Sequence, residues 1–182
     1  SLDTSFGTNG KVIFPYLFDL PYKSHLKLQN DGKILIATNE GDYQQSYNFL
    51  LIRLNTNGSF DSSFGTNGVV ITDFEPFGDS VNIVRSIELQ TDGKIILAGE
   101  SSTTGSPTQY ENFAIVRYNA DGILDASFGN NGRVSINIGS NSLSTYSIDG
   151  IYAVKLQSNG KIILGGYTDA QNLIEVYNLA LL

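Results

Sequence analysis

The chain has 182 residues, of which 41% are hydrophobic, and carries a formal net charge of −7 at pH 7. This composition predicts a folded core, while the acidic balance and the lack of a stripe of Lys and Arg argue against nucleic-acid binding. The absence of Cys excludes disulfides and thiolate metal sites, and no apolar run approaches the roughly 18 residues of a membrane-spanning helix, so we expect no membrane insertion.

Two short motifs recur in fixed order along the chain. The motif Ser-Phe-Gly-x-Asn-Gly begins at Ser5, Ser63 and Ser127. The motif Leu-Gln-x-Asp/Asn-Gly-Lys-Ile begins at Leu28, Leu89 and Leu156. Repetition at this period is typical of a protein built from one supersecondary unit per copy. The pattern predicts a single repeat domain over 1–182, with units at about 1–58, 59–122 and 123–182, the last of them cut short.

Four strands and no helix are predicted in each copy. In the first copy they cover residues 11–14, 24–29, 33–38 and 48–55, which are rich in Ile, Leu, Val and Phe and are separated by Gly, Asn, Asp and Pro. The turn between the second and third strands contains Asp31-Gly32 in the first copy, a pair suited to a tight type I′ hairpin. We therefore expect these strands to be antiparallel neighbours.

The fourth strand indicates how the sheets pack. Phe49 and Leu51 would face one side of this strand, while Leu50, Ile52 and Leu54 would face the other. A sheet that is apolar on both faces is typical of one packed between two similar sheets. The sequence therefore predicts an all-β fold, a β-propeller-like array of three four-stranded antiparallel blades. A solenoid of stacked hairpins is the alternative.

The recurring motifs also resemble those of a known family. The succession Leu-Asp-x-Ser-Phe-Gly-x-Asn-Gly, Leu-Gln-x-Asp-Gly-Lys-Ile and Asn-Phe-x-x-x-Arg-x-Asn-x-Asp-Gly resembles the delta-60 repeat, a β-propeller family common in large secreted or surface proteins of bacteria. The resemblance covers essentially the whole chain and implies a propeller in a bacterial extracellular or cell-surface protein. It brings no established reaction and no catalytic residues.

Three blades are fewer than a closed propeller normally has, and the third copy lacks its Asn-x-Asp-Gly segment. The chain also contains no Met, so we expect it to be a piece of a longer polypeptide. Further blades of the parent chain, or a second copy of this chain, are the expected partners for the two terminal blades.

The copies differ in length only after the first and third strands. In an up-and-down meander these connections leave on the same side, so the variation is predicted to collect on one face. Length variation on one face of a repeat protein usually marks its binding side. These connections hold most of the carboxylates and tyrosines of the chain but a single basic residue, Lys23.

Tyrosines beside carboxylates can stack on sugar rings and hydrogen-bond their hydroxyls, or can meet a cationic patch of a protein. The candidate ligand face comprises Tyr16, Tyr22, Tyr43, Tyr47, Asp42, Asp73, Glu75, Asp79, Tyr110, Glu111, Tyr146 and Tyr167. The alternative interpretation is that the acidic connections only keep the protein soluble.

Two further connections resemble a calcium loop, because side-chain oxygens at alternate positions precede or follow a Gly. Their candidate ligands are Asn55, Asn57 and Asp61 in one copy, and Asn119, Asp121 and Asp125 in the next. Calcium takes roughly six to eight oxygens, and these loops lack the carboxylate that would complete the shell. Asx turns explain the same residues. We therefore expect no cofactor and no metal, with calcium as the weaker alternative.

Other repeated side chains are expected to serve packing. The aromatic positions Phe6, Phe64 and Phe128 are predicted to fill the space between blades. Arg53 and its copy Arg117 are predicted to pair with a carboxylate or carbonyl of a neighbouring blade. The lone His25 has no counterpart in the other copies, so a Ser-His-Asp arrangement is not predicted.

These observations predict a non-enzymatic interaction module of a bacterial cell-surface or secreted protein. It would bind a protein or glycan partner through the variable, acidic, Tyr-rich face. A carbohydrate-active enzyme, either a glycosidase or a lyase, is one alternative, because any acidic face supplies pairs of carboxylates. A purely structural spacer is the other.

Overall fold

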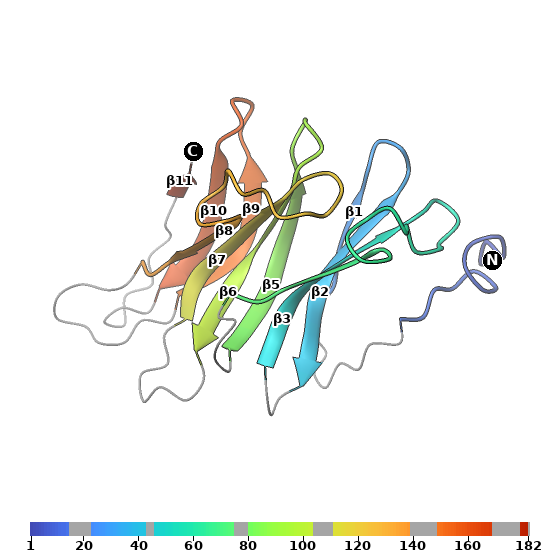
Figure 1. The fold of residues 1–182 in the computed structure, drawn as a ribbon, viewed down its shortest axis with the longest axis horizontal. Helices are drawn as coiled ribbons and strands as arrows, with labels where there is room; N and C mark the ends of the chain where they lie inside the picture. Colours follow the sequence, from blue (N-terminus) through green and yellow to red (C-terminus); the bar gives the residue numbers. More distant parts are fainter. Residues whose placement is uncertain are drawn as a thin grey trace.

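The computed structural model describes residues 1–14, 23–42, 46–74, 80–103, 111–138, 149–168 and 179–181. Every regular element within these ranges is a β-strand, so the described part of the chain is all-β. It holds no helix of the length and hydrophobicity that a membrane span requires. Figure 1 shows the strands arranged as three successive groups along the molecule.

The first group consists of β1 (His25–Leu28), β2 (Ile34–Asp42), β3 (Ser46–Leu54) and β4 (Val69–Thr72). The second consists of β5 (Ser80–Leu89), β6 (Ile95–Thr103), β7 (Glu111–Tyr118) and β8 (Arg133–Ile136). The third consists of β9 (Asp149–Leu156), β10 (Ile162–Thr168) and β11 (Leu179–Leu181). Within each group, neighbouring strands are antiparallel.

The hydrogen-bonded sheets are offset from the sequence repeats by one strand. Residues 11–14, expected to open the first unit as a strand, contain no strand, while their counterparts β4 and β8 pair with the strands that precede them, β3 and β7. Each complete sheet therefore joins three strands of one sequence unit to the first strand of the next. The reason is that the connection between β3 and β4 folds back tightly and returns the chain to the edge of its own sheet.

A type I′ turn produces this return, and it lies elsewhere than predicted. Asn67 and Gly68 both have positive φ, 52° and 91°, and Thr66 and Val69 exchange backbone hydrogen bonds of 2.9 and 3.2 Å across them. The type I′ turn requires positive φ at both central residues, which Asn tolerates better than most side chains. The Asn-Gly pair of the first motif therefore forms this turn.

The predicted type I′ turn at Asp31-Gly32 is wrong. Gly32 has a φ of 81°, whereas the φ of Asp31 is not positive. The amide of Gln29 donates to the carbonyl of Lys33 over 2.9 Å, which closes a three-residue loop. The Asp31 carboxylate accepts a hydrogen bond from the Lys33 amide, 3.1 Å. This local bond favours a type I turn followed by a left-handed Gly, the usual three-residue hairpin.

Apolar side chains pack on both faces of the sheets, as predicted. Phe49 and Leu51 belong to the buried cluster between the first and second sheets. Leu50, Ile52 and Leu54 form a separate cluster on the opposite face. A further buried cluster, which includes Ile96, Phe113, Ile151 and Leu164, lies between the second and third sheets.

The first strand of the second sheet and that of the third sheet each lie against the preceding sheet. Strand β5 contacts β1, β2 and β3, and β9 contacts β5, β6 and β7. A single parallel pair, Tyr47 with Val81, links β3 to β5 by hydrogen bonding. We refer to β1, β5 and β9 as the inner strands, because β5 contacts both of the others.

The repeated phenylalanines fill the space between sheets in the two later copies. Phe64 is fully buried, and the Arg53 guanidinium lies 4.3 Å from the centre of its ring. Its copy Phe128 is also buried, with Arg117 4.5 Å from its ring centre. A Cβ atom at Gly122, in the connection that follows β7, would lie 2.9 Å from the Phe64 ring. Phe64 therefore joins one sheet to the connection of the next.

Replacing Gly93 with Val should destabilise the protein by at least about 1 kcal/mol, because its φ of 86° is strained for any side chain with a Cβ atom. Thr91→Val, at an exposed position of the same turn, is the matched control and should change the free energy of unfolding by less than about 0.5 kcal/mol. Urea unfolding followed by circular dichroism measures both. Equal stability of the two variants would contradict the turn assignment.

Phe64→Ala should lower the free energy of unfolding by about 3 to 5 kcal/mol, because it opens a cavity between two packed sheets. Phe6→Ala removes the same side chain from the first copy, where the ring is only half-buried, and should cost clearly less. Urea denaturation of the two variants gives the comparison, and a Phe64→Ala protein as stable as wild type would place this ring outside the core.

Candidate functional site

The strand ends that border the variable connections lie at one end of the sheets. Asp42, the last residue of β2, pairs with Ser46, the first residue of β3. Likewise Asp149, the first residue of β9, pairs with Thr168, the last residue of β10. The end of β4 lies beside the same half of β3, since Thr72 pairs with Phe49. We call this the loop end and the opposite end, which holds the turns such as 29–33, the hairpin end. The arrowhead of β2 marks the loop end in Figure 1.

More than half of the candidate ligand face lies outside the described residues, namely Tyr16, Tyr22, Tyr43, Glu75, Asp79, Tyr110 and Tyr146. Of the others, Asp42 is the last residue of β2 and Glu111 the first of β7. Tyr47 is buried, so its ring offers no surface to a ligand. Asp73 Oδ1 accepts hydrogen bonds from Ser80 Oγ (2.9 Å) and Asn82 Nδ2 (3.2 Å), which ties the end of β4 to β5.

A bulge interrupts the inner strand of the second and third sheets at the same place. In β5 the register shifts between Val84 and Ser86, which leaves Arg85 as the extra residue. In β9 the pairing steps from Ala153 to Ile151, which leaves Tyr152 as the extra residue. Bulges redirect a side chain out of the regular alternation and are common beside functional sites. Arg85 and Tyr152 therefore share a position that the sheet geometry sets apart.

Each bulged residue contacts a side chain from the next strand of its own sheet. Arg85 donates two hydrogen bonds to the Glu100 carboxylate, from Nε to Oε1 (3.1 Å) and from Nη2 to Oε2 (3.0 Å). The ring of Tyr152 stacks on that of Tyr167, with the ring centres 5.3 Å apart and the planes inclined by 30°. Tyr152 is 70% exposed, whereas Glu100 is buried. We call these four residues the bulge site.

The two pairs adjoin one another across the gap between the second and third sheets. A Cβ atom at Gly150 would collide with the Tyr167 ring and lie 2.8 Å from Glu100 Oε1. Burial, reinforced by the nearby carboxylates of Glu100 and Glu111, raises the pKa of Tyr167 to about 12. The Tyr167 hydroxyl therefore keeps its proton at neutral pH.

Sequence reasoning included Tyr167 and Glu111 but missed Arg85, Glu100 and Tyr152. The signal was variation between copies: Asn39, Glu100 and Tyr167 follow the motif lysine at the same spacing, yet each copy carries a different side chain. In the first copy Asn39 binds the β5 backbone, with Nδ2 donating to Asn82 O (2.5 Å) and Oδ1 accepting from Val84 N (3.2 Å). The same position thus holds neighbouring sheets together in one copy and builds the bulge site in the others.

The inner strands are also linked by charge. Glu88 of β5 is buried and accepts hydrogen bonds from Lys27 of β1 (2.5 Å) and from Lys155 of β9. Burial alone would raise the pKa of Glu88, but the bonds from Lys155 and Lys27 outweigh it and hold the pKa below its ordinary value. Glu88 therefore stays ionised and connects all three inner strands.

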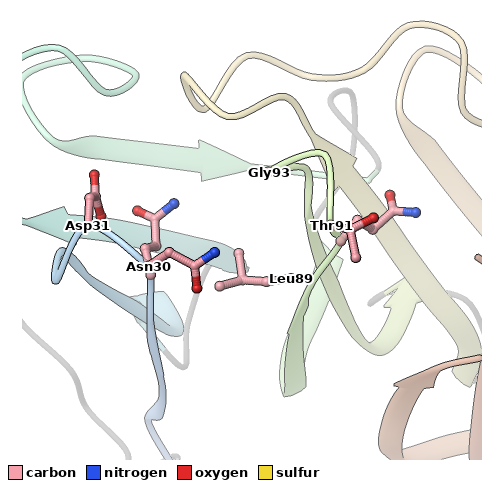
Figure 2. A pocket seen from close by; sticks show the side chains of 7 residues that line it. Asn30, Asp31, Leu89, Thr91 and Gly93 are labelled. Atoms are coloured by element: carbon pink, nitrogen blue, oxygen red, sulfur yellow. The ribbon is translucent and has the colours of Figure 1, made fainter. Parts of the chain in front are cut away.

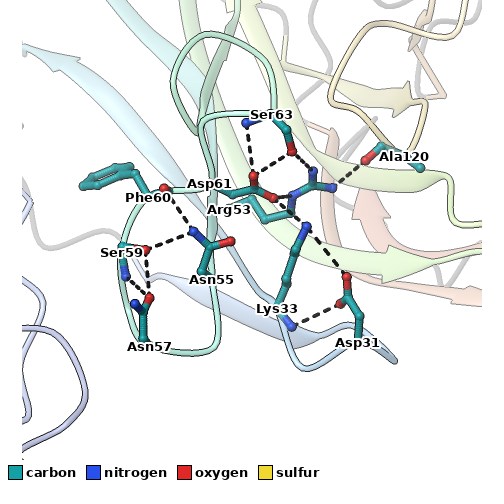
Figure 3. Close-up of polar contacts among 10 residues, drawn as sticks. All are labelled: Asp31, Lys33, Arg53, Asn55, Asn57, Ser59, Phe60, Asp61, Ser63 and Ala120. Carbon is teal, nitrogen blue, oxygen red and sulfur yellow. Dashed lines mark hydrogen bonds and ion pairs between the residues drawn. The ribbon is translucent and has the colours of Figure 1, made fainter.

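Figure 3 shows the polar cluster around the first repeated arginine. Asp61 Oδ2 pairs with Arg53 Nε (2.8 Å) and with Lys33 Nζ (2.9 Å), while its Oδ1 accepts from Ser63 Oγ (2.7 Å). Arg53 Nη1 donates to the carbonyl of Ala120 in the next copy over 2.6 Å. Of the two predicted partners of Arg53, a carboxylate or a carbonyl of a neighbouring unit, this bond shows the carbonyl.

The candidate calcium ligands take part in turns and ion pairs. Asn57 Oδ1 accepts from the Ser59 amide (3.0 Å), and Asp121 Oδ1 accepts from the Ile123 amide (3.0 Å), both of which are Asx turns. Asp125 pairs with Arg117 (2.8 Å) as Asp61 does with Arg53. Asn55 donates to Ser59 and Phe60, and Asn119 closes a turn through its backbone. Within the described ranges, no three His, Cys, Asp or Glu side chains gather where they would hold a metal ion.

A cleft of about 410 Å³ lies at the hairpin end, between the turns of the first and second sheets. Figure 2 shows Asn30 and Asp31 on one side and Leu89, Thr91 and Gly93 on the other. These turns have the same length in every copy, so the cleft follows from the spacing of the sheets. It is separate from the bulge site, which lies toward the loop end.

Two segments of the chain match a known family. Residues 29–64 and 90–128 match the model of a family described as a domain of unknown function (DUF5122) beta-propeller. Each match runs from the Gln of a hairpin turn to the Phe of the Ser-Phe-Gly motif, and so covers two strands and the connection that docks on the next sheet. These two segments are thus similar to repeats of a β-propeller family. Comparison with curated proteins finds no match.

The Asp61 cluster makes stability depend on pH. Burial raises the pKa of Asp61, but the hydrogen bonds from Ser63 and Lys33 and the charge of Arg53 outweigh it, so the pKa lies well below its ordinary 3.8. Because the folded state then binds fewer protons than the unfolded state, this stabilisation is present above about pH 4 and is lost as the pH falls toward the folded-state pKa.

We therefore expect the free energy of unfolding to fall on acidification below about pH 4. Asp61→Asn should be less stable than wild type at pH 7 and should lose less stability over the same acid range, while exposed Ser62→Ala should behave as wild type. Urea unfolding at pH 7, 4, 3 and 2 measures the dependence. Identical pH profiles for wild type and Asp61→Asn would contradict the ion-pair assignment.

Proposed function

We propose that this chain is a non-catalytic interaction module that binds a protein or glycan partner at the loop end. The observation that carries the proposal is the bulge site: two equivalent positions of a repeated scaffold hold Arg85–Glu100 in one copy and Tyr152–Tyr167 in the next. Repeat proteins keep packing residues alike and vary the residues that meet ligands. The bordering connections, which also vary between copies, belong to the same end of the sheets.

Each sheet is, in this proposal, one blade of a delta-60-type propeller, and the ring is completed by further blades of the parent chain or by a second copy. The exposed apolar residues of the first sheet support this proposal. Leu26 and Leu28 of β1 are 66% and 71% exposed, although their counterparts in β5 are at least half-buried. A bacterial cell-surface or secreted location is part of the same proposal and rests on the resemblance to the delta-60 repeat.

A carbohydrate-active enzyme is less well supported, because its general acid needs a carboxyl group free to exchange a proton with substrate. The buried carboxylates Asp61, Glu88, Glu100 and Asp125 are each held in ion pairs with Lys or Arg. Asp149 accepts a hydrogen bond from the Ile138 amide over 2.7 Å. These contacts hold the carboxylates within the protein.

The test combines binding with hydrolysis. The purified chain is applied to a glycan array and cross-linked to surface proteins on intact bacterial cells, and reducing-sugar release from the same glycans is measured. We expect saturable binding to one ligand class without release. Lys94→Ala, at the hairpin end, should bind as wild type does. Steady sugar release would show that the chain is a carbohydrate-active enzyme. No detectable binding in either binding assay would support the purely structural spacer.

A further inference from the structure

We propose that His25 is a pH-sensitive contact between the first and second sheets, and that protonation of its imidazole in mildly acidic solution loosens the packing of β1 on β5. His25 is the only histidine of the chain. Histidine is the side chain whose charge ordinarily changes between about pH 5 and pH 8. The inference concerns how the sheets hold together, so it does not depend on the proposed binding function.

The side chain of His25 faces the second sheet. Along β1 the side chains alternate, since Leu26 and Leu28 are exposed whereas His25 and Lys27 are half-buried. Lys27 reaches the Glu88 carboxylate of β5. Alternate residues of a strand lie on the same face of the sheet. His25 therefore shares the face of Lys27 that meets β5.

The equivalent residue of the next copy makes a hydrogen bond that His25 does not make. Ser86 precedes its Leu-Gln motif by the same spacing as His25, and its Oγ accepts from the amide of Val154 in β9 over 3.2 Å. His25 Nε2 is shielded from solvent and has no hydrogen-bond partner in the described part of the chain. Neutral imidazole can leave this nitrogen unprotonated, but the imidazolium carries an N–H there. Protonation would thus bury a donor without an acceptor.

The charges that act on the imidazole also oppose protonation. Burial, the Arg85 guanidinium of β5 and the Lys23 ammonium all lower the pKa of His25 from its ordinary 6.5. The other charged groups of the two strands that pack against β1 are Glu88 of β5, paired with Lys27, and two carboxylates of β2, Glu40, which accepts from Asn48, and Asp42 at the loop end.

The direction of the pH effect follows from these contacts. Because the folded state binds a proton at His25 more weakly than the unfolded chain does, the contribution of neutral His25 is fully present above its ordinary pKa of 6.5. It declines as the pH falls below that value, and the decline is complete below the folded-state pKa. One proton raises the opening equilibrium constant by at most about tenfold per pH unit. This range lies above the acid range of Asp61.

The contact at His25 covers apolar surface. Strand β5 contacts β1, β2 and β3, and Leu35, Phe49 and Leu51 of the first sheet belong to the cluster that the second sheet completes. Proteins open locally in cooperative units, and the least stable contacts open first. Acidification therefore favours states in which the first sheet separates from the second and this cluster meets solvent.

The test follows the lone histidine and the backbone amides by NMR. Titration of its Cε1 proton should give a pKa below that of the same proton in the urea-unfolded chain. Hydrogen-exchange protection factors of β1 and β2 should fall between pH 7.5 and 5.5 more than those of β6 and β7. His25→Gln, which takes up no proton, should remove this difference. Lys23→Gln should raise the pKa of His25, and exposed Lys11→Gln, the matched control, should leave it unchanged.

Three results would overturn the proposal. One is a His25 pKa in the folded protein equal to or above that of the unfolded chain. Another is an equal loss of protection in all four strands, and the third is the same loss in His25→Gln, because another group would then be responsible. Should His25→Gln fail to fold, the comparison of folded and unfolded His25 pKa values decides. None of these measurements uses a ligand, so their outcome is separate from that of the binding assays.

Discussion

The burial of both faces of each complete sheet is the constraint on which the rest of this structure depends. Strand β3 contributes Phe49 and Leu51 to one apolar cluster and Leu50 and Ile52 to another. Each such side chain, when buried, stabilises the fold by roughly 1.5 to 3 kcal/mol. A sheet with two apolar faces is stable only between neighbours, and this requirement makes the molecule an array.

Polar contacts then fix how the stacked sheets align. Apolar packing has little directional preference, but a buried polar group that misses its partner costs free energy. Asn39 binds the β5 backbone, Arg53 binds the Ala120 carbonyl, and Glu88 joins Lys27 to Lys155. Each contact joins different sheets, and each is satisfied only in one alignment. The inner strands are therefore held in a defined order.

Some residues of the repeats are the same in each copy and serve packing, whereas others differ between copies. Phe64 and Phe128, with their arginines, repeat because each fills the same gap between sheets. The bulge positions lie on β5 and β9, where the Arg85 side chain is 37% exposed and Tyr152 is 70% exposed. Glu100 and Tyr167 occupy one equivalent position with different chemistry. Copies of one supersecondary unit thus carry different side chains at the same structural position.

The sequence by itself determined most of the strands, the position of the turn at 29–33 and the two apolar faces, because alternation and the left-handed preference of Gly are local properties. It also placed Phe64 in the core, and it predicted that Arg53 pairs with a carboxylate or carbonyl of a neighbouring unit. Only the tertiary structure decided that residues 69–72 join the sheet before them, that the type I′ turn falls at Asn67-Gly68, and that Arg85 and Tyr152 leave the strand register. An apolar strand has the same period beside either neighbour, so its partner and its bulges are chosen by long-range hydrogen bonding and packing.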